Sequence, residues 1–156
     1  MGDQSEYRSQ LPWVLDRPTA LVIACSDGRW RPHIQDFVTN CLQLDPHFDV
    51  LQVPGGAEPL TLSDRVPKDF NFFRRRLEML MRVHRLRRII MIAHENCAWY
   101  HELRIRPGKV DLRARQIADL RFVRTQLRDF FGDVAIETYY ARLGANGSYV
   151  VFEAVT

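Results

Sequence analysis

The chain has 156 residues, of which 46% are hydrophobic and 26% are charged, a composition typical of one globular domain with a single core. Its 22 Lys and Arg residues stand against 19 Asp and Glu residues, giving a net charge of only +3, too small an excess to predict a nucleic-acid partner. The three cysteines are too few and too scattered for a disulfide framework, so we expect free thiols in a reducing compartment.

The first thirteen residues lack the basic and apolar regions of a signal peptide, and no later apolar run is long enough to cross a bilayer. We therefore expect a cytoplasmic protein with no membrane partner.

The first half of the chain predicts two strands and two helices. Residues 20–25 are apolar on both faces and stop at a polar turn, which is typical of a buried parallel strand. Pro32 suits a first helical turn, and apolar residues then recur at helical spacing until Asp45-Pro46. A second strand is expected over 48–53, a loop over 57–67 and an amphipathic helix over 69–87.

The second half continues the alternation of strands and helices. We expect a strand over 89–93, a short helix over 94–105, and a longer helix that ends at Phe131 with Ile117, Leu120, Leu127 and Phe130 facing inward. Residues 134–143 and 148–155 predict a terminal hairpin. The fold class is therefore α/β, a mainly parallel central sheet flanked by helices, with a C-terminal β-hairpin.

Three possible metal ligands follow two of the predicted strands: Cys25 follows the first, and His94 and Cys97 follow the third. Strand carboxyl ends are where open α/β sheets build their sites. His94 and Cys97 are three residues apart, so one helical turn would point both side chains the same way. Two thiolates and an imidazole suit zinc, and three protein ligands leave a fourth position open for catalysis.

Asp27 and Arg29 follow Cys25 at alternate positions, so all three side chains point to one side if the strand conformation persists. Asp27 would then lie beside the metal, where it accepts a proton or takes the fourth position, and Arg29 would hold its carboxylate. The competing interpretation is that Asp27 caps a turn and pairs with Arg29 on the surface.

The segment Cys25-Ser26-Asp27-Gly28-Arg29, followed at the third strand by His94-Glu95-Asn96-Cys97, resembles the C-x-D-x-R and H-x-x-C motifs of the β-class carbonic anhydrases. The resemblance implies one Zn²⁺ per chain held by Cys25, His94 and Cys97, with Asp27 and Arg29 as the catalytic dyad. The implied reaction is the hydration of carbon dioxide to bicarbonate by zinc-bound hydroxide. It also implies a single domain over 1–156, with residues 1–18 as an arm, and a homodimer or higher homo-oligomer.

The sequence departs from the family after the second strand, where Val53-Pro54-Gly55-Gly56 replaces the usual Arg-Asn-Ala-Gly. We assign Val53, Gly55 and Gly56 to the substrate pocket, although a tight turn would use the same two glycines. The altered loop leaves two alternatives open. One is hydrolysis of a related small molecule, carbonyl sulfide or carbon disulfide. The other is a non-catalytic zinc-binding regulatory protein.

Other conspicuous residues have simpler interpretations. Cys41 lies on the apolar face of the first helix and is expected to pack in the core. His84 is expected to be a core or boundary residue. The arginines between 74 and 88 form a basic helix, which we interpret as a solvated face.

Overall fold

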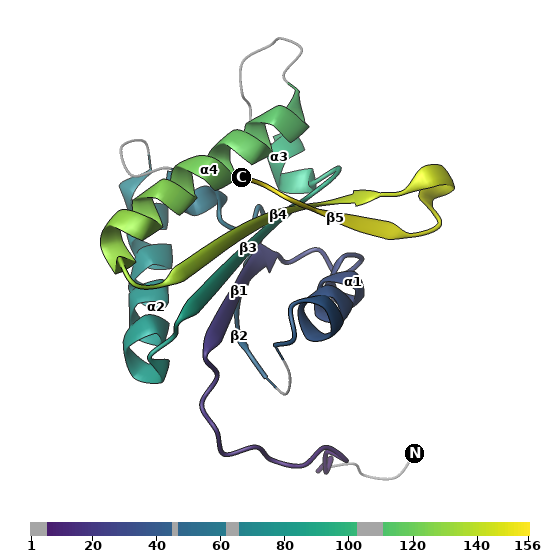
Figure 1. Cartoon of the computed structure of the whole chain (residues 1–156). Helices are drawn as coiled ribbons and strands as arrows, with labels where there is room; N and C mark the ends of the chain where they lie inside the picture. The colour runs from purple at the N-terminus through teal and green to yellow at the C-terminus, as the bar shows by residue number, and fades with distance from the viewer. Residues whose placement is uncertain (1–5, 45–46, 62–65, 103–110) are drawn as a thin grey trace.

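The computed structural model of the chain describes residues 6–44, 47–61, 66–102 and 111–156. Its centre is a five-stranded sheet of order β2-β1-β3-β4-β5 (Figure 1). Strands β1 to β4 are parallel where they pair, and β5 runs antiparallel to β4. The predicted α/β class and the terminal hairpin are confirmed. The strands are β1 (Ala20–Cys25), β2 (Asp49–Val53), β3 (Arg88–His94), β4 (Ala135–Leu143) and β5 (Val150–Ala154).

Helices cover both faces of the sheet (Figure 1). Helices α2 and α4 pack on one face, and α1 lies on the other. The helical segments are α1 (Arg31–Asp36), the π-helical turn η1 (Phe37–Cys41), the 3₁₀ turn η2 (Glu58–Thr61), α2 (Pro67–His84), α3 (Ala98–Glu102), α4 (Leu112–Phe131) and the 3₁₀ turn η3 (Ala145–Gly147).

Strand β1 shows why the central strands are apolar without alternation. Leu21 and Ile23 belong to the core that β1 shares with α2 and α4. Val22 and Ala24 belong to the core shared with α1. A strand buried on both faces needs apolar side chains at every position. The edge strand β2 is less covered, and its Val50 is half exposed.

The first helix departs from the prediction at its carboxyl end. Pro32 lies in the first turn as expected, but the regular helix stops at Asp36 and continues as η1. A π turn holds more residues than an α turn, so the 3.6-residue spacing no longer determines which side chains face the core. Cys41 is consequently exposed, and the prediction that it packs in the core is wrong. The expected break at Asp45-Pro46 lies outside the described residues.

Three further boundaries differ from the sequence expectation. Part of the loop expected over 57–67 is the 3₁₀ turn η2, while residues 62–65 lie outside the described part of the chain. Helix α2 ends at His84 rather than at residue 87, because Arg85 takes a left-handed backbone conformation with φ of 54°. The short helix expected over 94–105 begins only at Ala98, because His94 is the last residue of β3 and a turn follows it. Residues 103–105 of that expected helix lie outside the described ranges.

The long helix α4 begins where Asp111 accepts a hydrogen bond from the backbone N–H of Ala114. Leu120 and Leu127 are buried and Ile117 packs against the core, as predicted. The prediction that Phe130 faces inward is wrong, since its side chain is 61% exposed. Phe130 lies in the last turn, where the helix passes the edge of the core it shares with α2.

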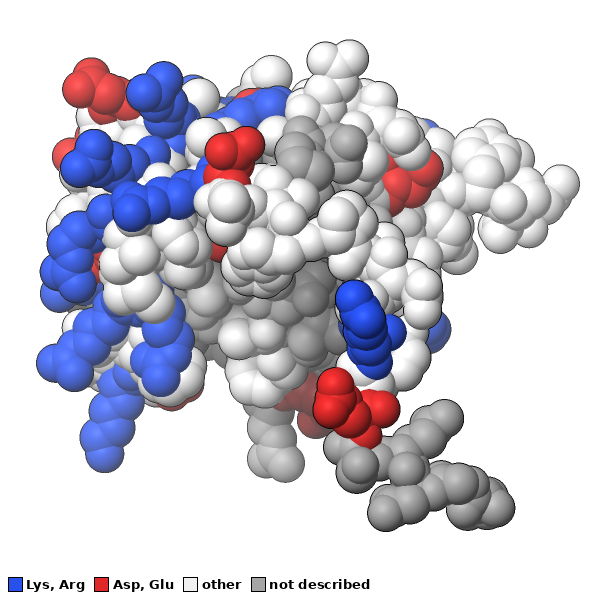
Figure 2. Space-filling model, turned by 90° about the horizontal axis from the view of Figure 1, so that it is seen from below, with Lys and Arg blue, Asp and Glu red and all other residues white. Residues whose placement is uncertain are grey.

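Basic side chains gather on the side of the molecule where α2 lies (Figure 2). Arg74 pairs with Glu78 at 3.4 Å, and the guanidinium of Arg76 stacks 3.4 Å from the ring centre of Phe72. Contacts of this kind, within the outer side of one helix, agree with a solvated basic face. Across the described ranges, no helix combines the length and apolar character needed to span a bilayer.

Candidate metal centre

The parallel pairing of β1 with β3 brings the three predicted ligands together. Cys25 is the last residue of β1 and His94 the last of β3, and Ala24 pairs with Ile92 in the register between them. Cys97 lies in the turn before α3. The ligand atoms of the three side chains all lie within 4.8 Å of one another, and the two sulfur atoms are 3.8 Å apart. Two sulfurs bound to one tetrahedral zinc lie about 3.8 Å apart, so their spacing fits the ion.

The hydrogen bonding of His94 leaves its Nε2 atom available as a metal ligand. Its Nδ1 lies 2.8 Å from the backbone oxygen of Glu95, which accepts a hydrogen bond only if Nδ1 carries the proton. Nε2 then holds a free lone pair, and it is buried without a hydrogen-bond partner among the described residues. The ring of Trp30 packs beside the imidazole, with ring centres 4.8 Å apart. A buried nitrogen left without a partner fits a metal ligand.

The two thiols share one environment. Because Cys97 donates a hydrogen bond to the sulfur of Cys25, the pKa of Cys25 is lowered. The backbone N–H groups of Asp27 and Gly55 lower it further, against the effect of burial. The same sulfur contact, together with burial, raises the pKa of Cys97. The site therefore already stabilises one thiolate, the form that binds a metal.

Asp27 and Arg29, which follow Cys25 along the chain, form a two-point contact. Arg29 Nη2 lies 2.7 Å from Asp27 Oδ2, and Arg29 Nε lies 3.1 Å from Oδ1. The backbone N–H of Arg29 also donates to Oδ1, at 3.0 Å. These contacts, with a smaller contribution from His94, lower the pKa of Asp27 to about 2. The carboxylate is therefore ionised and held in one orientation.

The backbone brings Asp27 and Arg29 together in a different way from the one expected from the sequence. The strand ends at Cys25 and the chain turns over residues 28–30, so the prediction that alternation along a continuing strand aligns Cys25, Asp27 and Arg29 is wrong. Asp27 closes the turn through its own side chain and also pairs with Arg29. The capping role and the ion pair, which the sequence analysis set against the dyad, are thus both present. Arg29 is 76% exposed at its side chain, while Asp27 is 17% exposed.

The loop after β2 runs along the same edge of the sheet. Val53 is half-buried, and Gly55 and Gly56 have φ of 82° and 63°. A Cβ atom on Gly55 would lie 2.3 Å from Trp99 Cδ1, and one on Gly56 would lie 3.2 Å from the backbone nitrogen of Cys25. The two glycines therefore serve the turn and its packing against Trp99 and β1.

A family model described as "Putative carbonic anhydrase" matches residues 16–149. The chain belongs to this family. The resemblance inferred from the two motifs is confirmed. None of the curated proteins matches the sequence significantly.

The solved structures that resemble the chain include the following three, all at low sequence identity. The β-carbonic anhydrase isoform I of Trichomonas vaginalis is 13% identical, with 96% of this chain and 87% of that chain covered and a TM-score of 0.55. The β-carbonic anhydrase CafA of Aspergillus fumigatus is 17% identical, with coverage of 90% and 77% and a TM-score of 0.47. A structure from a study of two tetrameric β-carbonic anhydrases of Sordaria macrospora is 14% identical, with coverage of 88% and 81% and a TM-score of 0.42. The first of these likenesses shows that the chain shares the fold of the β-carbonic anhydrases.

Several residues around the metal centre were not found by the sequence analysis. Trp30 follows Arg29 directly, so an aromatic residue next to the motif was the available signal. Gln116 and Asp119 are buried polar residues on the inward face of α4, where apolar residues were expected. Polar residues that interrupt the apolar face of a helix were the signal there. Trp99 and Glu58 meet only in the fold, where Trp99 Nε1 donates to Glu58 Oε2 at 3.0 Å.

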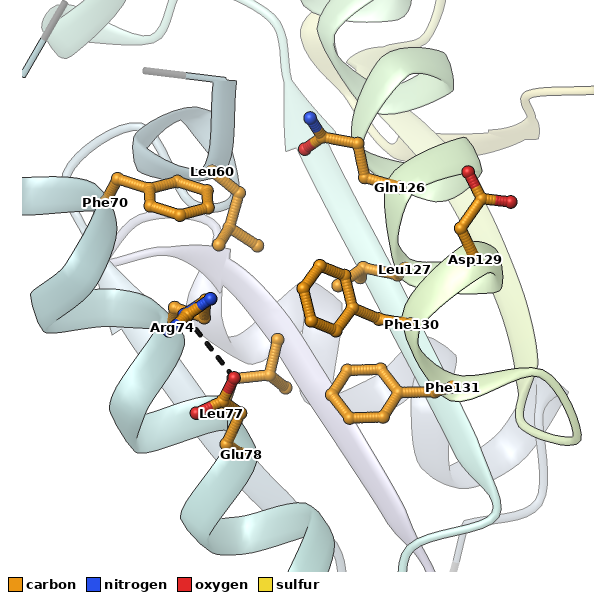
Figure 3. Close-up of a pocket in the computed structure, with 10 residues that line it drawn as sticks. All are labelled: Leu60, Phe70, Arg74, Leu77, Glu78, Gln126, Leu127, Asp129, Phe130 and Phe131. Atoms are coloured by element: carbon orange, nitrogen blue, oxygen red, sulfur yellow. Dashed lines mark ion pairs between the residues drawn. The ribbon is translucent and has the colours of Figure 1, made fainter. Parts of the chain in front are cut away.

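An apolar cavity of about 150 Å³ lies elsewhere, between α2 and α4 (Figure 3). Phe70, Phe130 and Phe131 contribute to its walls, and Arg74 and Glu78 pair at its margin. None of the predicted site residues lines it. Chemistry at the metal centre therefore does not use this cavity.

Proposed function

We propose that this protein is a zinc lyase of the carbonic anhydrase type, which hydrates carbon dioxide at a metal centre formed by Cys25, His94 and Cys97. The observation that carries the proposal is the convergence of three donor atoms within 4.8 Å, with His94 Nε2 buried and lacking a hydrogen-bond partner among the described residues. When bound, zinc supplies Lewis acidity that brings the ionisation of water close to neutral pH.

The residues of the chain have separate roles in binding the metal and in orienting the reacting water. Cys25 as a thiolate, Cys97, and His94 through the free lone pair of Nε2 would hold the metal. The Asp27 carboxylate, kept ionised and oriented by Arg29, accepts a hydrogen bond from the reacting water at Oδ1 or Oδ2 and so orients it for attack. The half-buried position of Asp27, against the exposed Arg29, puts the acceptor on the inner side of the pair. The proton released on hydration passes to solvent on the exposed side of this pair.

The test is stopped-flow hydration of carbon dioxide by protein with measured zinc content, from about pH 6.5 to 9. We expect hydration that rises with pH in the wild type. Asp27→Asn should keep its zinc and lose turnover by about 100-fold or more. Asp133→Asn, an exposed carboxyl before β4, should behave as the wild type. Equal rates in Asp27→Asn and the wild type would contradict the role of the dyad.

A second substrate class is favoured by one observation, the replacement of the family's Arg-Asn loop by Val53-Pro54-Gly55-Gly56. Trp99 packs against Gly55 there and makes this side of the site more apolar. An uncharged molecule such as carbonyl sulfide or carbon disulfide would bind next to this apolar surface more favourably than a charged product would. Zinc-loaded protein that hydrolyses either compound but leaves carbon dioxide unchanged would transfer the assignment to that substrate. Turnover of none of the three would indicate a zinc-binding regulatory protein.

The N-terminal arm favours a homodimer or higher homo-oligomer. Leu11, Trp13 and Leu15 are 81%, 87% and 87% exposed in the single chain, and the arm extends away from the sheet (Figure 1). Large apolar side chains at alternate positions of an extended segment share one face. We propose that a second copy of the chain covers this face.

The free thiols agree with a reducing, cytoplasmic setting.

A further inference from the structure

We infer that α4 positions the metal ligands, through two buried side chains that hold the segment from His94 to Tyr100 at separate points. The inference rests on the proposed metal centre and adds to it Gln116 and Asp119 as positioning residues. Neither touches a ligand atom. Each contacts the chain at or close after a ligand residue.

Gln116 holds the backbone of His94. Its side chain is 2% exposed, and its Nε2 donates to the backbone oxygen of His94 at 3.0 Å. On the other side of the same peptide unit, the N–H of Glu95 donates to the backbone oxygen of Ala141 in β4, at 2.8 Å. The peptide between His94 and Glu95 is thus held by a helix on one side and by a strand on the other.

This peptide controls the direction of the imidazole. His94 Nδ1 bonds to the backbone oxygen of Glu95, one residue further along the chain. That oxygen belongs to the next peptide unit, whose position depends on the backbone dihedrals on either side of the held peptide. A change in these dihedrals would move the acceptor and turn the ring, with Nε2, away from the sulfur atoms. Gln116 therefore acts on the ligand through the backbone, in the way that outer hydrogen bonds orient metal-binding histidines.

Asp119 holds the other ligand segment through Tyr100. The buried Tyr100 hydroxyl donates to Asp119 Oδ2 at 2.9 Å, and Arg115 Nε lies 2.9 Å from Asp119 Oδ1. Tyr100 also packs against Cys25 and Cys97 in one small apolar cluster. The described part of α3 has five residues, and a helical segment of that length is not stable without tertiary contacts. The hydroxyl contact supplies one and so fixes the turn that carries Cys97.

Both contacts come from one rigid element. Gln116 and Asp119 are three residues apart, so they share a face of α4. The 20-residue helix packs on the sheet through Leu120, Val123 and Leu127. The positions of His94 and Cys97 are consequently fixed relative to the same helix, which pre-organises the site before metal arrives.

The alternative is that these hydrogen bonds only satisfy buried polar groups and contribute to stability alone. Metal affinity separates the two roles. The test variants are Gln116→Met and Tyr100→Phe, which preserve shape and remove one hydrogen-bonding group each. The matched controls are Thr138→Val, which removes a buried hydroxyl that donates to Val155, and Tyr139→Phe, which removes a hydroxyl that donates to Glu137.

The experiment measures zinc affinity by chelator competition, the absorption spectrum of the cobalt-substituted protein, and the unfolding midpoint of the metal-free protein. We expect both test variants to bind zinc roughly 10- to 100-fold more weakly than the wild type and to shift the cobalt spectrum. Both controls should keep the wild-type affinity and spectrum, even where their unfolding midpoints fall. If Gln116→Met does not fold, Tyr100→Phe, which lacks a single oxygen atom, decides the test.

Zinc affinities within twofold of the wild type in both test variants would overturn the positioning role and leave the proposed metal centre intact. An equal loss of affinity in the controls would also overturn it, because general destabilisation would then explain the effect. A wild type that binds no zinc would instead contradict the proposed function itself, and the inference with it.

Discussion

The sulfur atoms of Cys25 and Cys97 lie 3.8 Å apart, although 72 residues separate them in the sequence. The pairing of β1 with β3 accounts for this approach, since it puts the ends of both strands at one edge of the sheet. Their buried position separates them from Cys41, which is exposed at the end of η1. The three thiols of the chain should therefore differ in their response to metal.

We predict that zinc protects Cys25 and Cys97 from alkylation and leaves Cys41 unaffected. A metal-bound thiolate reacts slowly with alkylating reagents, whereas an exposed free thiol is accessible in either form. Mass spectrometry of iodoacetamide-treated protein should show labelling of Cys25 and Cys97 slowed about tenfold or more by zinc. Protection of Cys41 to the same degree would indicate that the zinc binds elsewhere.

Gly55 should tolerate alanine poorly because of Trp99. An added Cβ would lie 2.3 Å from the Trp99 ring, and the backbone has a φ of 82° that disfavours other residues. Gly147, with a φ of 67° and nothing within 4 Å of an added Cβ, is the matched control. We expect Gly55→Ala to lower the free energy of unfolding by about 3 kcal/mol and Gly147→Ala by about 1 kcal/mol in denaturant titrations. Equal losses would contradict the packing of Trp99 on this loop.

Glu58 should make stability depend on pH. Burial raises the pKa of its carboxyl above the ordinary value of 4.5, although the hydrogen bond from Trp99 partly opposes that shift. The folded state therefore binds the proton more tightly than the unfolded state does, and this contribution to stability is lost as pH rises from about 4.5 through the folded-state pKa. Glu58→Gln should remove this loss.

The measurement compares the free energy of unfolding of wild type and Glu58→Gln between pH 4 and pH 7. The variant should gain stability relative to the wild type as the pH increases. A constant difference across that range would show that burial does not perturb this carboxyl.

The arm should control the oligomeric state. Replacing Leu11, Trp13 and Leu15 with serine removes the exposed apolar face without touching the core. Light scattering coupled to gel filtration should report an oligomer for the wild type and a smaller assembly for the triple variant. An unchanged mass in the triple variant would show that the assembly uses another surface.

Local pattern was sufficient to predict the strands and the three side chains that come together at their ends. The run from Ala20 to Cys25 is apolar at every position because β1 is covered on both faces, and such a run is visible without any tertiary information. The ligands follow from the same logic, since each lies at or just after the end of a strand whose position was predicted.

The residues that the sequence did not reveal depend on tertiary contacts. The sequence pattern places Cys41 on the core-facing side only if the first helix keeps 3.6 residues per turn. The π turn changes that spacing. Gln116 faces inward because it bonds to the backbone of His94, which lies 22 residues earlier. Phe130 has the expected helical phase but lies beyond the edge of the core. Hydrophobic periodicity predicts which residues share one face of a helix, but it does not predict which tertiary elements pack against that face.

The most direct test of the account is the zinc content of the purified protein, measured by mass spectrometry in the wild type, Cys97→Ser and Cys41→Ser. We predict about one zinc per chain in the wild type and in Cys41→Ser, and almost none in Cys97→Ser. A wild type without zinc, or a Cys97→Ser variant with the full wild-type content, would contradict it.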